Sequence, residues 1–191
     1  MMIGTSERVT RETEVKVSLR INGKGTHKIS TSVGFLDHML TELAVHSLMD
    51  LEILAKGDLE HHIVEDVAIT LGETLEKALG ERKGIRRFGD AIVPMDDAMA
   101  LAAVDLVHRS YSSVELSLRG KKIEDIASED LVHFIQTLSG SLQATIHVQV
   151  MKGKNDHHKI EAAFKALALA LREAWSSDIG REGVPSSKGK I

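Results

Sequence analysis

Alternating apolar and polar residues predict several short strands along the chain. In residues 13–21 (TEVKVSLRI) apolar side chains occupy every second position, which is typical of a strand with one buried face. Asn22 and Gly23 follow as a turn signal, so we expect residues 27–33 to return beside this strand as its partner. Further strands are predicted at residues 51–55, 99–107, 113–118 and 145–150.

A second periodicity, with apolar residues three and four positions apart, predicts four helices. In the first of them, over residues 35–47, the apolar positions are Phe35, Leu36, Met39, Leu40 and Leu43. Residues 61–80 form a longer amphipathic stretch with one apolar stripe, and Gly80 is typical of a helix end. Residues 129–142 and 157–175 are also predicted to be helical. No Pro- or Ser-rich linker divides the chain.

The two halves of the chain repeat the same order of features. In each half a lone histidine lies on a predicted helix, a strand and a Lys-Gly turn follow, and an HHxxE motif then opens a long helix. The first copy contains His38, His61, His62 and Glu65, and the second contains His133, His157, His158 and Glu161. The lone histidine precedes the pair by 23 residues in the first copy and by 24 in the second. We interpret this as a duplication within one domain of residues 1–191, with halves of about 11–95 and 96–183.

The repeated HHxxE motif has the spacing of a metal site. On a helix, His61 and Glu65 lie on one face and can hold a single cation, and the same is true of His157 and Glu161. The second histidine of each pair is rotated by about 100° around the helix, so we expect it to reach a different ion. Each of two sites would then combine a histidine and a glutamate from one helix, the second histidine of the other, and one lone histidine. Such ligands suit Mn, Fe, Co, Ni or Zn and leave positions open for a substrate.

Composition narrows the classes of function. The 191 residues include 10 histidines and no cysteine, which excludes disulfides, thiolate zinc sites, iron–sulfur clusters and cysteine nucleophiles. The formal net charge of -4 provides no global basic field for nucleic acid or an anionic membrane. No apolar run approaches the roughly 20 residues of a membrane span. The polar N-terminal segment lacks the apolar stretch of a secretion signal, so we expect a cytoplasmic protein without nucleic-acid or membrane partners.

Two basic segments are candidate anion sites. Residues 83–89 (KGIRRFG) place Arg86 and Arg87 between glycines, and a guanidinium matches the geometry of a phosphate. Residues 184–191 (VPSSKGKI) form a polar, basic tail that offers hydroxyls and an ammonium group. From the sequence alone, a solvated turn and a frayed terminus are the commoner interpretations of such segments. The chain contains neither a P-loop nor a GxGxxG dinucleotide fingerprint.

Taken together, the motifs resemble the imidazoleglycerol-phosphate dehydratase family of histidine biosynthesis. The matching segments are residues 34–40 (GFLDHML), 61–66 (HHxxED), 84–89 (GIRRFG), 94–98 (PMDDA), 155–162 (NDHHxxEA) and 185–189 (PSSKG). They occur in the order of the family and extend from about residue 11 to residue 189.

The resemblance implies a hydro-lyase that converts D-erythro-imidazoleglycerol phosphate to imidazole acetol phosphate with two Mn²⁺ per subunit. It implies an α+β fold of two pseudo-symmetric halves, each a small sheet covered by two helices. It also implies a homo-oligomer of twenty-four subunits built from trimers, with active sites between subunits.

Site residues follow from the same resemblance. The implied metal ligands are His38, His61, His62, Glu65, His133, His157, His158 and Glu161. The implied substrate-binding residues are Glu12, His38, His46, Arg87, Arg109, Lys165, Ser186, Ser187 and Lys188, of which Arg87, Arg109 and the tail would hold the phosphate. The implied catalytic residues are Glu12, His46, Glu65 and Glu161. His46 is our candidate acid for the departing hydroxyl, and Glu12 is a candidate for proton transfer near the side-chain carbons.

Two other classes of protein use similar ligands. One is a different dinuclear metal enzyme, such as a hydrolase of a phosphorylated metabolite, and the other is a non-catalytic metal-binding protein. A storage protein has no reason to keep Arg87, Arg109 and a Ser-Ser-Lys tail together. A hydrolase would release phosphate or an alcohol, whereas a dehydratase forms a ketone and keeps the phosphate, so the product distinguishes them.

Overall fold

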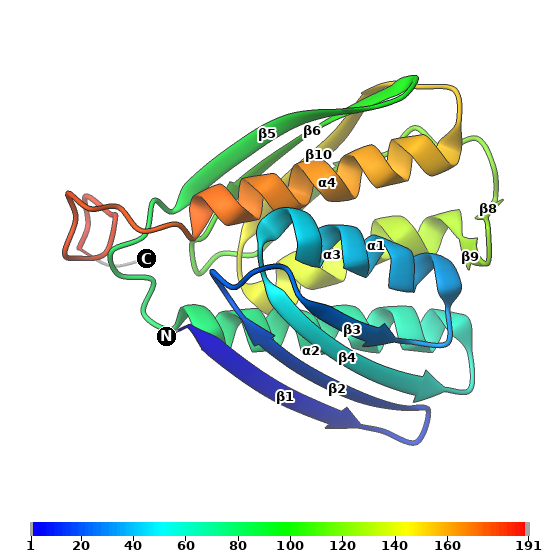
Figure 1. Cartoon of the computed structure of the whole chain (residues 1–191), viewed down its shortest axis with the longest axis horizontal. Helices are drawn as coiled ribbons and strands as arrows, with labels where there is room; N and C mark the ends of the chain where they lie inside the picture. The colour runs from blue at the N-terminus through cyan, green and yellow to red at the C-terminus, as the bar shows by residue number, and fades with distance from the viewer. Residues whose placement is uncertain (1, 190–191) are drawn as a thin grey trace.

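Two four-stranded sheets enclose four helices (Figure 1). The structure is a computed structural model and describes residues 2–189. The first sheet has the order β1-β2-β4-β3, formed by β1 (Ile3–Val9), β2 (Thr13–Arg20), β3 (His27–Ser30) and β4 (Asp50–Gly57). The second has the order β5-β6-β10-β7, formed by β5 (Phe88–Met95), β6 (Ala98–Asp105), β7 (Tyr111–Glu115) and β10 (Thr145–Lys152). The helices are α1 (Gly34–Ser47), α2 (Glu60–Leu79), α3 (Ser128–Leu142) and α4 (Asp156–Ala174).

The two halves share one topology, which confirms the duplicated α+β fold. In each half the first two strands and the last strand pair antiparallel, while the third strand pairs in parallel with the last. Helix α1 connects the parallel strands β3 and β4, and α3 connects β7 and β10. The second half additionally contains a small hairpin of β8 (Lys122–Ile123) and β9 (Ile126–Ala127) before α3.

The predicted pairing of residues 13–21 with residues 27–33 is wrong. Strand β3 pairs with β4 in parallel, with Ile29 opposite Ile53, and β4 lies between β2 and β3. The physical reason is the helix after β3: because α1 carries the chain back along the sheet, β4 runs in the same direction as β3 and takes the place next to β2. Residues 27–30 are therefore an edge strand, not the second arm of a hairpin.

Strands β1 and β5 were not predicted, because their apolar residues are not the buried ones. In β1 the exposed positions include Ile3 and Val9, while Gly4 and Ser6 are buried. A side chain at Gly4 would collide with the backbone of α2, so the close approach of strand and helix requires glycine. The bounds of the two halves differ from the predicted ones of about 11–95 and 96–183. The first half begins with β1, before residue 11, and ends with α2. The second half begins with β5, which pairs in the second sheet, and ends with α4.

Helices from different halves pack together in the core. Helix α1 of the first half contacts α4 of the second, and α3 of the second half contacts α2 of the first. The packing of α2 on α3 is close at Gly72, where an added Cβ would lie 2.6 Å from Cβ of Ser141. The rings of Phe134 and Phe164, 5.7 Å apart, join α3 to α4. This exchange brings the lone histidine of each half beside the HHxxE motif of the other.

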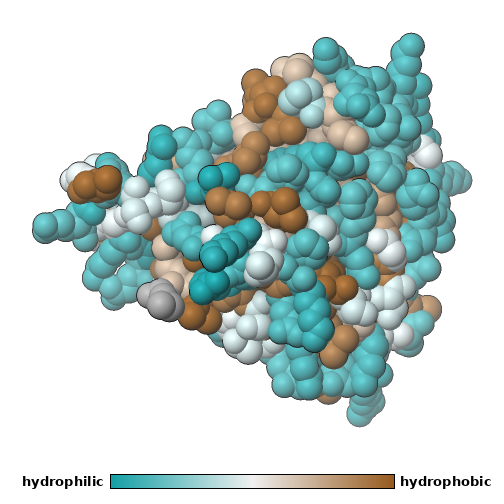
Figure 2. All heavy atoms as spheres, viewed as in Figure 1, coloured by the Kyte–Doolittle hydropathy of each residue, from teal (hydrophilic) through white to brown (hydrophobic). Residues whose placement is uncertain are grey.

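The visible surface is mainly hydrophilic. On the face shown in Figure 2, hydrophobic residues form small separate groups among hydrophilic ones. Within residues 2–189, each helix is too short or too polar to cross a lipid bilayer.

Candidate metal centres and anion site

The first group of potential metal ligands joins α1 to α4. His38 Nε2 lies 3.7 Å from Glu161 Oε2, and His157 Nε2 lies 3.4 Å from the same oxygen. One potential ligand atom from each of the three residues lies within 4.8 Å of the others. We call this group the His38 centre.

The second group joins α2 to α3 in the corresponding way. His133 Nε2 lies 3.4 Å from Glu65 Oε1, and the rings of His61 and His133 stack with centroids 5.5 Å apart. One potential ligand atom from each of His61, Glu65 and His133 likewise lies within 4.8 Å of the others, and we call these residues the His61 centre. Each centre therefore contains two imidazoles and one carboxylate, a donor set that fits a divalent first-row metal.

Carboxylates orient all four histidines of the two pairs. The Nδ1 atoms lie 2.6 Å from Asp130 for His61, 2.8 Å from Asp58 for His62, 3.2 Å from Glu124 for His157 and 2.7 Å from Asp97 for His158. With Nδ1–H donating to a carboxylate, Nε2 keeps its lone pair, which is the arrangement of metal-binding histidines. Sequence reasoning missed these four carboxylates, because their contacts, apart from the i,i+4 pair of Asp58 and His62, join distant segments.

The second histidine of each pair lies outside both groups of three among the described residues. His62 lies at Asp58, with Glu12 Oε2 3.8 Å from its Nδ1, and His158 lies at Asp97. Neighbouring residues of a helix project about 100° apart, so these rings turn toward the loops instead of toward the centres. The hydrogen bond to Asp58 raises the pKa of His62, and the one from His158 is the main reason that the pKa of Asp97 lies well below its usual range. Metal binding by His62 and His158 stays a prediction.

A lysine and a second glutamate adjoin the His38 centre. Lys165 Nζ lies 2.6 Å from Glu161 Oε1 and 3.5 Å from Glu42 Oε2, and Glu42 also lies 3.0 Å from His46 Nε2. Burial works to raise the pKa of Glu161, but the hydrogen bond and charge of Lys165 outweigh it and lower this pKa. Burial likewise works to lower the pKa of Lys165, yet Glu161 and Glu42 raise it. The sequence could have indicated Glu42, since it lies four residues from both His38 and His46 on one helix.

Arg87 and the tail form a separate polar group. The Arg87 guanidinium donates to Asp105 through Nε (2.6 Å) and Nη2 (2.9 Å), and through Nη1 to the carbonyl of Pro185 (2.9 Å). Its backbone has a φ of 73°, in the left-handed region. Arg109 lies exposed beyond the end of β6. In the tail, Ser186 is half-buried while Ser187 and Lys188 are exposed, and residues 190–191 lie outside the described part.

Arg87 and the tail lie at the opposite end of the molecule from the two centres: the tail extends from the side where α4 ends, and the centres lie on the side where α4 begins (Figure 1). His157 is the second residue of α4, whereas the Arg87 amide donates to the carbonyl of Ala174, the last residue of that helix. The 17 helical steps from His157 to Ala174 correspond to about 25 Å along the helix axis. One chain therefore holds Arg87 and the tail bonded to it far from its own candidate metal ligands.

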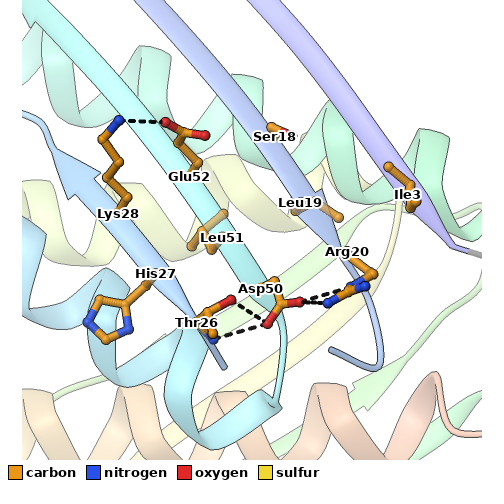
Figure 3. Close-up of a pocket in the computed structure, with 10 residues that line it drawn as sticks. All are labelled: Ile3, Ser18, Leu19, Arg20, Thr26, His27, Lys28, Asp50, Leu51 and Glu52. Carbon is orange, nitrogen blue, oxygen red and sulfur yellow. Dashed lines mark hydrogen bonds and ion pairs between the residues drawn. The ribbon is translucent and has the colours of Figure 1, made fainter. Parts of the chain in front are cut away.

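A further hollow lies over the first sheet (Figure 3). Its charged residues are paired: Asp50 binds Arg20 and Thr26, and Lys28 lies 3.1 Å from Glu52. Backbone and side-chain hydrogen bonds from Lys24 and Thr26 hold the pKa of Asp50 well below its usual range despite burial. Because these charges neutralise one another, the hollow offers no comparable catalytic group.

Comparison with known proteins gives one consistent result. The profile of the imidazoleglycerol-phosphate dehydratase family matches residues 31–171. Imidazoleglycerol-phosphate dehydratase of Methanothermobacter thermautotrophicus is 52% identical over 187 residues, which cover 96% of this chain and 95% of that protein. The protein of the same name from Chlorobium luteolum is 48% identical over 190 residues, covering 98% and 94%.

Solved structures agree with this result. The dehydratase from Pyrococcus furiosus superposes with a TM-score of 0.86 at 40% identity, covering 97% of this chain and 100% of that one. The enzyme from Staphylococcus aureus gives a TM-score of 0.85 at 34% identity, covering 92% and 99%. The chain therefore belongs to the imidazoleglycerol-phosphate dehydratase family, the hydro-lyases of histidine biosynthesis.

Proposed function

We propose that this enzyme converts D-erythro-imidazoleglycerol phosphate to imidazole acetol phosphate at a site that holds two Mn²⁺ per subunit. The observation that carries this proposal is the pair of centres related by the repeat, each with two imidazoles and one carboxylate within 4.8 Å. The substrate is a small phosphorylated imidazole, and its ring nitrogens are ligands of the same kind as the histidines.

The ligands of the two ions would be the His38 and His61 centres, completed by His62 and His158. When bound, the ions act as Lewis acids and as a template for the substrate imidazole. Glu65 and Glu161 supply the anionic ligands, and the carboxylates at Nδ1 keep the histidine Nε2 atoms available.

Protons would be moved by His46 on α1 and by Glu12 in the loop between β1 and β2. His46 donates a proton to the departing hydroxyl, and its Nε2 lies 3.0 Å from the carboxylate of Glu42, which orients the ring. Glu12 lies beside His62 in the loop between β1 and β2 and handles the proton near the side-chain carbons. Lys165 binds the substrate and holds the carboxylate of Glu161 in place.

The phosphate would be held by Arg87, Arg109, Ser186, Ser187 and Lys188 of another copy of the chain. The separation of about 25 Å along α4 supports this arrangement, since both groups must contact one small substrate. A closed homo-oligomer supplies such contacts repeatedly, and we propose the assembly of twenty-four subunits built from trimers.

Turnover by metal-free protein tests the proposal. Protein stripped with EDTA is assayed on imidazoleglycerol phosphate with and without added Mn²⁺, and both ketone and free phosphate are followed. We expect ketone only when Mn²⁺ is present, with no free phosphate. Release of phosphate would indicate a hydrolase instead. Absence of ketone from protein that binds two ions per chain would refute the proposed site.

A further inference from the structure

The repeat gives the two centres the same types of ligand, but the residues that contact these ligands differ between the two halves. We propose that the centres bind divalent cations with different affinities, so that the His61 centre fills first and the His38 centre second. This inference rests on the proposed function, since it takes both groups as metal sites.

The first difference is the carboxylate that orients each histidine. Asp130 lies 2.6 Å from His61 Nδ1 and its side chain is 7% exposed, whereas Glu124 lies 3.2 Å from His157 Nδ1 and is 59% exposed. Three residues before the lone histidine, the second half has Asp130 where the first half has Phe35, whose ring packs 5.0 Å from that of His157. A short hydrogen bond to a buried carboxylate fixes the orientation and the tautomer of the imidazole more firmly than a longer one to an exposed carboxylate.

The second difference is the residue one helical turn after each glutamate ligand. After Glu161 this residue is Lys165, whose ammonium group occupies the carboxylate at 2.6 Å. After Glu65 it is Ile69, and the nearest basic partner of Glu65 among the described residues is His133 at 3.4 Å. A cation that binds Glu161 must therefore share or displace an existing cationic partner, while one that binds Glu65 need not.

The third difference is the residue one turn after each lone histidine. Glu42 follows His38 and balances the charge of Lys165, whereas the neutral Thr137 follows His133. The carboxylates near the His38 centre therefore already have ion-pair partners. Glu161 is paired with Lys165, and Glu42 is paired with Lys165 and His46. Of the two centres, the His61 centre has the glutamate whose described ion-pair partner is a ligand histidine instead of a lysine, and it has the more strongly oriented histidine. Both differences favour tighter binding at the His61 centre.

Calorimetric titration of the metal-free enzyme with Mn²⁺ tests this order, and the electron paramagnetic resonance signal of free Mn²⁺ counts the bound ions independently. We expect two steps of one ion per chain, with dissociation constants about 10-fold or more apart, in line with the effect of such hydrogen-bond partners on metal affinity. A single step of two equivalent ions, or no binding, would overturn the inference.

Two variants assign the steps to the centres. Asp130→Asn is expected to weaken only the tighter step, by about 10- to 100-fold. Lys165→Met is expected to strengthen only the weaker step, by about tenfold, because it removes the competing cation. Lys77→Met and Asp178→Asn, which lie away from both centres, are matched controls that should change neither step. Circular dichroism verifies folding, and Glu124→Gln, which removes an exposed charge, replaces Asp130→Asn in the comparison if that variant unfolds; it should weaken only the second step.

The order of metal binding and the dehydratase reaction are tested separately. If the steps are equal while Mn²⁺ still supports ketone formation, this inference fails and the proposed function stands. If the steps are ordered but no ketone forms, the proposed function fails while the inequality of the centres stands. If Lys165→Met weakens the second step, the lysine supports the ion instead of competing with it, and the inference is wrong.

Discussion

A carboxylate behind an imidazole decides which ring nitrogen faces outward. Asp130, Asp58 and Asp97 each lie within 2.8 Å of a histidine Nδ1, so three different segments orient three histidines in the same sense. Such partners change metal affinity by about 10- to 100-fold even though they do not touch the ion. The HHxxE motif is therefore only part of each centre.

His46→Ala tests the proposed proton donor. Its ring lies 3.0 Å from Glu42 and outside both groups of metal ligands, so we expect kcat to fall by about 10²- to 10⁴-fold while metal content stays unchanged. Steady-state kinetics and metal analysis of the purified variant measure both quantities. His27→Ala, on an exposed edge strand, is the matched control and should keep normal turnover. Normal turnover of His46→Ala with full metal content would exclude the acid role.

At the residue scale, the sequence predicts the candidate metal ligands better than it predicts the carboxylates that orient them. His157 and Glu161 are a local pair, so helical spacing alone indicates that they meet. Asp130 and His61 are 69 positions apart, and only the packing of α2 on α3 brings them together. A single sequence contains no signal for such a contact.

At the scale of elements, each centre depends on helices from different halves. His38 reaches Glu161 because α1 packs on α4, and His133 reaches Glu65 because α3 packs on α2. The close approach of α2 and α3 requires a small residue at Gly72, where a Cβ would lie 2.9 Å from the backbone nitrogen of Leu142.

Gly72→Ala tests this helix contact. Alanine normally stabilises a helix relative to glycine, but here overpacking should lower the free energy of unfolding by about 1–3 kcal/mol. Gly140→Ala is the matched control, because Gly140 lies in α3 with no atom within 4 Å of an added Cβ. It should raise the free energy of unfolding by about 0.5–1 kcal/mol. Urea unfolding followed by circular dichroism measures both, and equal stabilisation by the two substitutions would contradict the packing argument.

The order of the strands in a sheet was less predictable than the segments that form them. The alternation in β2 and β4 identifies both strands, yet nothing in it shows that β4 inserts between β2 and β3. Burial of small residues in β1, such as Gly4 and Ser6, hides that strand from any hydrophobic pattern. Elements with an apolar face are therefore predictable, whereas a strand that buries small residues, such as β1, is defined by what packs against it.

At the scale of the whole molecule, the chain holds its two candidate binding groups at opposite ends. The backbone of Arg87 is bonded to Ala174, the last residue of α4, whereas His157 is the second residue of that helix. The two ends of the helix lie about 25 Å apart. Since one small substrate must reach both, we expect each active site to combine the metal end of one copy with the anion end of another.

Mixing two inactive variants tests this arrangement. Arg87→Ala lacks the anion contact and His46→Ala lacks the proposed acid, so each should show little turnover alone. Metal-free chains mixed in equal amounts and reassembled with Mn²⁺ should regain about a quarter of normal activity, because random pairing places both intact groups in one site at about that frequency. Each variant reassembled alone is the control. Mixed assemblies, verified by differential tagging, that stay inactive would contradict a shared site.

Local patterns in the sequence suffice to predict the duplication, the four helices and the candidate metal ligands, because helical spacing and a repeated motif are local properties. The sequence also sufficed for the family, through motifs spread over nearly the whole chain. The packing of the folded chain shows which histidine lies beside which glutamate and which carboxylate orients each ring, and it places Arg87 far from the candidate metal ligands of its own chain. These are contacts between segments distant in sequence, and they depend on how the helices and sheets pack, which no local pattern records.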